Sequence, residues 1–290
     1  MPDTLPSLAH WRRHGHFIHF RRHQLFVHQQ GDGLPVLLLH AFPTASYDYA
    51  RLAPLLCQRY QLILFDYPGF GFSDKPRRYP YSLLTYADAL EAVMRHFGIT
   101  RTCVVAHDIG TSVLLEVLRR GTLVVERLVL LNTSIVPQNR VIRSLDTARS
   151  ILLNPVLGPL IGHLRLIRRP LVARMLTPLF ARRLTPEELH NFWLLVRSND
   201  GPRIYHRLAG YLAERDQHEQ AWLEALIRYT GSLALVWGEA DPIATPFVAD
   251  TIVRLRPDTV ATRLAQIGHY PHWEAPVATA RAIDAAFGSS

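Results

Sequence analysis

A carboxylate stands at the apex of a predicted sharp turn between a strand and a helix. Residues 102–106 form an apolar run that predicts a buried strand, and residues 112–120 have the amphipathic pattern of a helix. Ala106 and Gly110 each lie two positions from Asp108, and their small size suits a turn in which backbone groups crowd together. A side chain at such an apex is positioned as a nucleophile. A carboxylate there attacks an sp³ carbon and forms an alkyl ester, whereas a serine usually attacks a carbonyl.

Two later residues could complete the chemistry of Asp108. Asp241 follows the predicted strand 233–237, and His269 follows the predicted strand 262–266. Ligands in open α/β sheets bind at the carboxyl ends of the strands, so we expect these side chains to lie near Asp108. His269 would be the base that activates water, and Asp241 would orient it, in the chain order nucleophile, acid, histidine.

Other polar residues near these positions are weaker candidates. Glu239 could compete with Asp241 as the acid, although a loop carboxylate is its expected role. Asn132, at the end of the predicted strand 128–132, is expected near the site. Ser112 lies past the apex and inside the predicted helix, so it is a poor nucleophile.

Strand and helix patterns alternate along the chain. Apolar runs rich in Val, Ile and Leu predict strands of a parallel sheet that is covered on both faces. We therefore predict an α/β fold with a mostly parallel, doubly wound sheet. The predicted strands are the hairpin 17–20 and 25–29, then 36–40, 62–65, 103–106, 128–132, 233–237 and 262–266; the helices between them are 49–58, 82–97, 112–120, 246–255 and 276–287.

One long region breaks this alternation. Residues 137–229 contain only helical patterns, at 139–153, 159–167, 171–180, 186–198, 202–214 and 218–228. A helical insertion after one strand, followed by a return to the sheet, is typical of a cap. We therefore predict a core made of residues 1–136 and 230–290, and a helical cap over 137–229.

The loop after the first parallel strand supplies a second feature of catalytic sites. His40-Ala41-Phe42-Pro43 follows the predicted strand, and this turn commonly donates one backbone N–H to an oxyanion hole. The residue after the nucleophile donates the other. Phe42 and Ile109 are therefore the predicted oxyanion donors, through their amides.

Composition limits the remaining function classes. The net charge is +8, but the basic residues are scattered and no nucleic-acid-binding signature is present, so we expect no nucleic-acid partner. Two cysteines make no disulfide framework, and no signal peptide or membrane span is visible, so we expect a cytoplasmic protein. The apolar segment 151–180, interrupted by prolines and arginines, leaves peripheral contact with a membrane surface open.

Taken together, these motifs resemble the α/β-hydrolase superfamily, in its branch with an aspartate nucleophile. That branch includes epoxide hydrolases and haloalkane dehalogenases, and the chain is also similar to the hydrolase-like mesoderm-specific transcript group. The resemblance covers nearly the whole chain, with Ala41 where epoxide hydrolases have glycine. It is carried by the segments Leu38–Asp48, Gly69–Pro76, His107–Gly110, Arg197–Gly201 and Gly268–Pro271.

The residue after the nucleophile distinguishes the subfamilies. Haloalkane dehalogenases usually have a tryptophan there to hold the halide, and fluoroacetate dehalogenases have an arginine, but this chain has Ile109. Epoxide hydrolases instead use tyrosines of the cap to donate to the epoxide oxygen. The resemblance therefore implies roles for Tyr211 and, less strongly, Tyr205.

The expected activity is hydrolysis of an epoxide to a vicinal diol, without a cofactor or a metal. The expected partner is a small lipophilic substrate, and the oligomeric state is left open. The alternatives are a haloalkane dehalogenase, another ester or lactone hydrolase, or a non-catalytic ligand-binding protein on the same scaffold.

Overall fold

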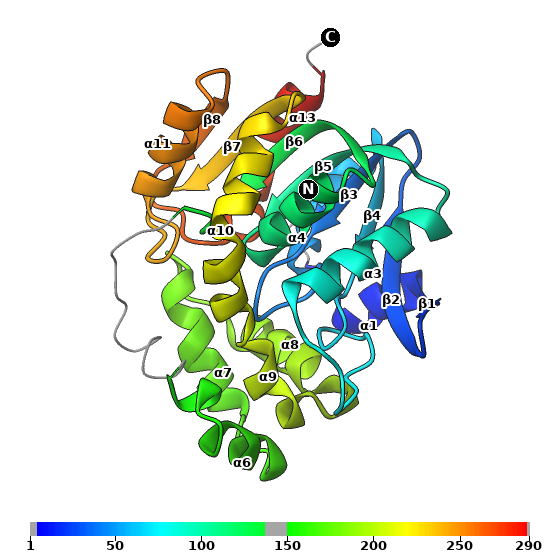
Figure 1. Ribbon diagram of the computed structural model, residues 1–290, viewed down its shortest axis with the longest axis vertical. Helices are drawn as coiled ribbons and strands as arrows, with labels where there is room; N and C mark the ends of the chain where they lie inside the picture. Colours follow the sequence, from blue (N-terminus) through cyan, green and yellow to red (C-terminus); the bar gives the residue numbers. More distant parts are fainter. Residues whose placement is uncertain (1–4, 137–149, 289–290) are drawn as a thin grey trace.

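An eight-stranded sheet forms the centre of the protein, which the computed structural model describes over residues 5–136 and 150–288 (Figure 1). The first two strands form the predicted antiparallel hairpin, the second pairs antiparallel with β4, and all other neighbours are parallel. The predicted α/β sheet is therefore confirmed. In spatial order the strands are β1 (Gly15–Phe20), β2 (His23–Gln30), β4 (Tyr60–Phe65), β3 (Leu34–Leu39), β5 (Arg101–His107), β6 (Val124–Leu131), β7 (Ser232–Gly238) and β8 (Val260–Leu264).

Continuous apolar runs form the central strands because helices cover both faces of the sheet. The last four residues of β3 and the last six of β5 are buried. β6 begins at Val124, four residues before the predicted start. The sequence pattern missed these residues because Glu126 and Arg127 interrupt the apolar run. The core strands β3, β5, β6 and β7 lie side by side, so the loops at their carboxyl ends meet at one edge of the sheet.

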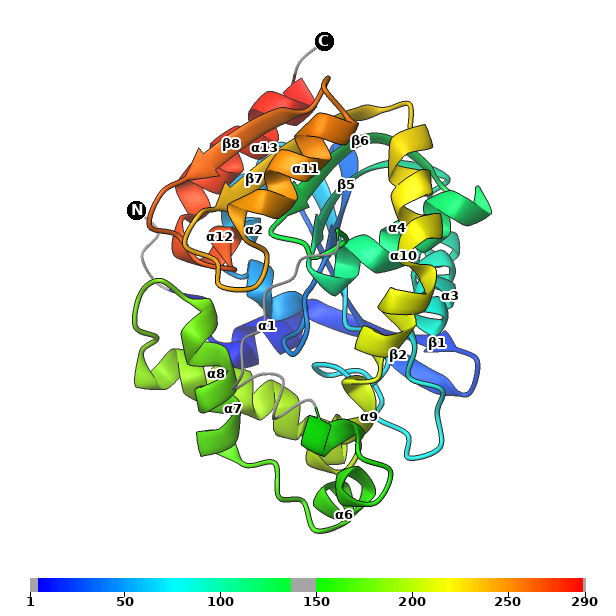
Figure 2. The same cartoon turned by 60° about the vertical axis from the view of Figure 1, so that its left-hand side comes forward.

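The helices form a layer on each face of this sheet. α3 (Leu83–His96), α4 (Ile109–Arg120) and α10 (Tyr211–Arg228) lie side by side on one face, and α13 (Pro276–Gly288) packs on β6 and β7 from the other (Figures 1 and 2). α11 (Pro246–Leu255) has the predicted bounds. α3 begins with a capping box of Ser82 and Thr85, which satisfies free amides of its first turn.

A group of helices lies beyond the carboxyl edge of the sheet, between β6 and β7 in the chain (Figure 2). The division into a core and a cap at residues 137 and 229 stays a prediction, and α10, within the predicted cap, packs along α4. The other helices between β6 and β7 are α6 (Leu157–His163), α7 (Arg169–Leu176), α8 (Pro186–Arg197) and α9 (Tyr205–Leu208), with the 3₁₀ helices η2 (Thr177–Leu179) and η3 (Ser198–Arg203).

Several predicted helices differ from the structure. Two helices were predicted at 202–214 and 218–228, but the structure has η3, α9 and α10 there. α10 is continuous because no glycine or proline interrupts residues 211–228. The predicted helix 49–58 is instead η1 (Ser46–Tyr49) and the short α2 (Ala53–Leu56), where Pro54 suits the first turn of a new helix. Short helices α1 (Leu8–His14) and α12 (Pro271–Glu274) were not predicted. Most of the predicted helix 139–153 lies outside the described residues.

A buried carboxylate joins α8 to the loops of the core. Glu188 of α8 accepts hydrogen bonds from Trp273 Nε1 (2.9 Å), Arg51 (2.9 Å) and Arg182, and it closes a capping box with Thr185. Burial opposes ionisation of Glu188, but these donors outweigh it and lower its pKa to about 2. The ionised form of this side chain therefore stabilises the folded state.

Replacing this carboxylate should cost stability in a pH-dependent way. We expect Glu188→Gln to lower the free energy of unfolding by about 1–3 kcal/mol at pH 7, because its donors lose a charged acceptor. The pKa is lowered on folding, so the contribution of Glu188 is present above about pH 4.5 and is lost as the pH falls towards 2. Urea unfolding at pH 7 and pH 3 measures this, with the exposed Glu187→Gln as control. An equal loss for both variants would contradict this account.

Candidate active site

The turn at Asp108 is as sharp and as crowded as the sequence predicts. β5 ends at His107 and α4 begins at Ile109, so Asp108 alone connects them, with φ 48° and ψ −115°. This backbone conformation is strained for a residue other than glycine. A Cβ on Gly110 would lie 2.8 Å from both the Cβ and the carbonyl oxygen of Leu39 in β3, closer than real contacts allow. Ser112 lies inside α4, away from the apex.

Two backbone amides interact with the Asp108 carboxylate. The Phe42 amide donates to Oδ2 at 3.1 Å, and the Ile109 amide also forms a hydrogen bond that favours the charged form. Burial raises the pKa of Asp108, while His269 and the two amides oppose this rise. The structure therefore brings together the predicted nucleophile and both predicted oxyanion donors.

His269 and Asp241 form a buried pair at the same edge of the sheet. His269 Nδ1 lies 2.7 Å from Asp241 Oδ2. Asp241 also accepts from Asn132 Nδ2 (2.8 Å) and from the Ile243 amide (2.7 Å). Glu239 is exposed to solvent, whereas Asp241 is buried and contacts His269.

The charges of this pair set the protonation of the histidine. Burial by itself would lower the pKa of His269, but Asp241, through its charge and hydrogen bond, and the nearby Asp108 raise it above the usual 6.5. The His269 backbone is fixed as well. Its amide donates to Leu179 O (2.7 Å), and its carbonyl oxygen lies 2.8 Å from His107 Nε2.

The two predicted tyrosines both approach the oxyanion loop. The Phe42 ring lies 5.1 Å from the ring of Tyr211 and 5.9 Å from that of Tyr205, centre to centre. Both tyrosines are buried, and the Tyr205 hydroxyl lies 3.9 Å from the sulfur of Met175. The structure thus places both rings beside the loop that contacts Asp108, with the hydroxyl of Tyr205 directed to a weak acceptor.

Comparisons with known proteins identify the family of this fold. A model of the alpha/beta hydrolase fold family matches residues 35–276. The chain belongs to the alpha/beta hydrolase fold family. It is 38% identical to LipZ of Mycobacterium tuberculosis, a protein named as a hydrolase, over 96% of this chain and 97% of LipZ. It is 32% identical to the mesoderm-specific transcript protein of Mus musculus, over 95% of this chain and 86% of that one.

A solved structure supports the same fold. Haloalkane dehalogenase DbeA from Bradyrhizobium elkani superimposes with a TM-score of 0.81 at 24% identity, covering 93% of this chain and 96% of DbeA. At this identity the likeness concerns the fold alone.

Sequence reasoning missed some residues that support the site. Tyr270 stacks on Phe180 with ring centres 4.6 Å apart, and its hydroxyl lies 3.5 Å from the carbonyl oxygen of Phe42. Thr133, just after β6, donates to the carbonyl oxygen of Asp108 at 3.3 Å. The sequence signal for Thr133 was its position, because the end of β6 lies between the ends of β5 and β7.

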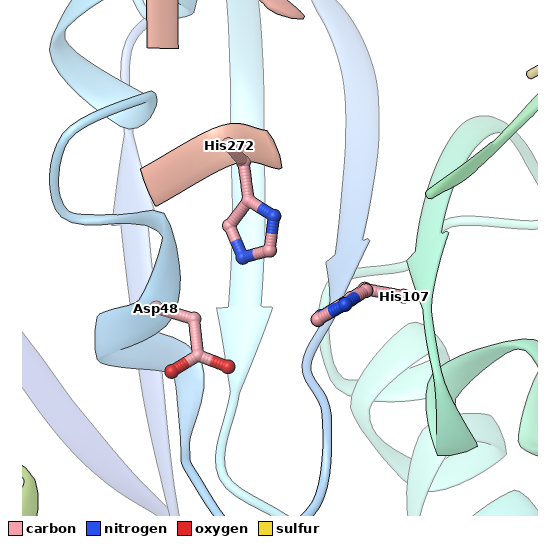
Figure 3. A group of neighbouring side chains, drawn as sticks. All are labelled: Asp48, His107 and His272. Atoms are coloured by element: carbon pink, nitrogen blue, oxygen red, sulfur yellow. The ribbon is translucent and has the colours of Figure 1, made fainter. Parts of the chain in front are cut away.

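A buried cluster behind His269 contains residue types that bind metals (Figure 3). Asp48, His107 and His272 come from η1, β5 and α12, and their potential ligand atoms lie within 4.8 Å of one another. Burial raises the pKa of Asp48 and lowers the pKa of His107, and it lowers that of His272 to about 3. Asp48 Oδ1, His107 Nδ1 and both ring nitrogens of His272 have no hydrogen-bond partner among the described residues, and the expected hydrolysis uses none of them.

The expected hydrolysis needs no metal, and metal removal tests this. We expect purified protein treated with a chelator to keep its unfolding temperature and its hydrolytic rate, because no proposed step uses the Asp48 cluster. Elemental analysis and thermal unfolding before and after the treatment check this. A stoichiometric metal that is absent from the His272→Ala variant, and whose removal abolishes activity, would contradict it.

The crowding at Gly110 gives a second prediction. We expect Gly110→Ala to lower the free energy of unfolding by about 1–3 kcal/mol, because its new methyl group must displace Leu39 of β3. Denaturant unfolding measures the change. Gly288→Ala is the matched control, since a Cβ there meets nothing within 4 Å. Equal stability of the two variants would show that the turn is not crowded.

Proposed function

We propose that this protein hydrolyses a lipophilic epoxide to a vicinal diol, with Asp108 as the nucleophile and without a cofactor. The observation that supports this most directly is a carboxylate, and not a hydroxyl, at the strained turn where an amide donates to Oδ2. Hydrolysis as the general class is also what the name of LipZ assigns to that protein.

The first step forms a covalent ester. Asp108 Oδ1 attacks one epoxide carbon, a new carbon–oxygen bond forms, and the ring carbon–oxygen bond breaks. The ring oxygen takes a proton from a tyrosine of the cap, with Tyr211 as the preferred donor and Tyr205 as the second. Oδ2 stays with the Phe42 amide, which leaves the other carboxylate oxygen for the attack.

The second step hydrolyses this ester with water. Neutral His269 takes a proton from water, and the resulting hydroxide attacks the carboxyl carbon of Asp108. Asp241 stabilises the imidazolium that forms, and the Phe42 and Ile109 amides hold the oxyanion. The intermediate then collapses and releases the diol, whose oxygen receives the proton from His269. The proton left on the restored Asp108 carboxyl group passes through water to the tyrosinate, which returns both side chains to their starting states. The sum is an epoxide plus one water.

Ile109 favours an epoxide over a haloalkane. Its side chain is apolar and buried, so it has no donor for a leaving halide. The tyrosine rings beside Phe42 instead offer hydroxyl groups that can protonate an alkoxide. A donor of this kind matters for an epoxide, because the leaving oxygen carries a full negative charge when it is not protonated.

Trapping the ester tests this mechanism. In a His269→Gln variant the second step should stop, so incubation with a panel of lipophilic epoxides should add one substrate mass to the protein. Peptide mass spectrometry should locate the adduct on Asp108, and the matched Asp108→Asn, His269→Gln variant should form none. An adduct on Ser112, or one formed only with haloalkanes or lactones, would overturn the proposal. No adduct and no turnover, with unchanged ligand binding after Asp108→Ala, would favour a binding protein.

The pH dependence follows from the protonation of His269. Its pKa is raised above 6.5, and only the neutral imidazole accepts a proton from water, so kcat should fall as the pH drops below this raised value. The acidic limb of the profile should therefore lie above pH 6.5. His19→Gln, at an exposed position, should leave the limb unchanged, and Asp241→Asn should move it to lower pH. An acidic limb near pH 4 would assign the step to a carboxyl group instead.

A further inference from the structure

The exposed apolar side chains of this protein are concentrated at one end. Of the fifteen large apolar residues exposed in the described chain, eight lie between residues 151 and 171. This segment contains α6 and the connection to α7, at the end of the molecule far from the sheet in both views (Figures 1 and 2). We call six of its residues the cap-tip patch: Val156, Leu157, Leu160, Leu164, Leu166 and Leu171.

The outward direction of these side chains is fixed by the packing of α6. Gly158 and Gly162 are its buried residues, and they face the rest of the cap. A Cβ on Gly162 would collide with the carbonyl oxygen of Arg203 and with His206, so the backbone of α6 approaches its neighbours closely. The small residues of α6 therefore point inward, and Leu157, Leu160 and Leu164 point outward. This is the reverse of the usual arrangement in a surface helix.

Charge identifies the surface that this patch fits. Residues 150–186 contain six arginines and no aspartate or glutamate. Arg168, Arg169 and Arg174 are exposed, and no ion pair among the described residues involves them. Arg165 is exposed as well but pairs with Asp200. An exposed apolar patch rimmed by cations is the pattern of a helix that lies in the interface of an anionic membrane.

The same charges disfavour a second copy of this chain as the occupant. A symmetric contact through the cap-tip patch would bring two sets of arginines together, with no acidic side chain in residues 150–186 to balance them. No helix in the described ranges is both long enough and apolar enough to cross a bilayer.

We propose that the cap-tip patch docks this protein on the surface of an anionic lipid bilayer. The outward leucines of α6 enter the boundary between headgroups and acyl chains, and Arg168 and Arg174 contact lipid phosphates. This inference is independent of the proposed function, because it rests on the outer face of α6 and uses no residue of the site.

Vesicle co-sedimentation of the full chain tests the proposal. Vesicles of phosphatidylcholine with phosphatidylglycerol should bind the protein about tenfold or more tightly than phosphatidylcholine alone, and about 0.5 M NaCl should weaken the binding. The variant Leu157→Ser, Leu160→Ser, Leu164→Ser should lose about tenfold in affinity. Arg168→Gln with Arg174→Gln should lose about fivefold for each arginine. Both should keep the circular dichroism spectrum and the rate with a water-soluble substrate.

The matched control replaces two exposed valines outside the cap. Val124→Ser with Val260→Ser removes two exposed apolar side chains from the first residues of β6 and β8 and should leave vesicle binding unchanged. Binding that is equal for all variants, or equal for neutral and anionic vesicles, would overturn the proposal. A concentration-dependent dimer that only the leucine variant loses, with no vesicle binding, would assign the patch to a second copy. If the leucine variant fails to fold, the loss of vesicle binding by the arginine variant still tests the proposal.

Discussion

The position of every group in this site depends on one crowded connection, the turn that holds Asp108 between β5 and α4. Its positive φ is unfavourable for a side chain with a Cβ, and it persists because the parallel neighbours β3 and β6 fix both ends of β5. The close approach of Gly110 to Leu39 brings the start of α4 against the end of β3. The Phe42 loop, which follows β3, is thereby held beside the carboxylate.

Burial makes the remaining interactions of the site strong. Asp241 is nearly inaccessible, and Asn132, the Ile243 amide and His269 form hydrogen bonds with its oxygens. This fixed charge raises the pKa of His269 and holds the imidazole in one orientation. The cluster of Asp48, His107 and His272 lies next to it and supports the His269 backbone through a hydrogen bond of His107.

The sequence was sufficient to predict the sheet and its edge residues, because apolar strands, short loops and small turn residues are local signals. Asp108, Gly110 and Phe42 could be placed in this way. The helices around residues 198–228 could not, since the break at Asn199 and Asp200 depends on positive φ values that hydrogen bonds to the core help to hold. The role of Tyr270 was also hidden, because it acts through a contact between segments distant in sequence.

A single turnover in ¹⁸O-labelled water tests the central claim that Asp108 is the nucleophile. With enzyme in excess over epoxide, the oxygen added to the first diol should come from the Asp108 carboxylate, so that diol should carry no label. The peptide containing Asp108 should instead gain about 2 mass units, because water restores the carboxylate by attacking the ester. Label in the first diol, with none in Asp108, would mean that water attacks the substrate directly and would contradict the account.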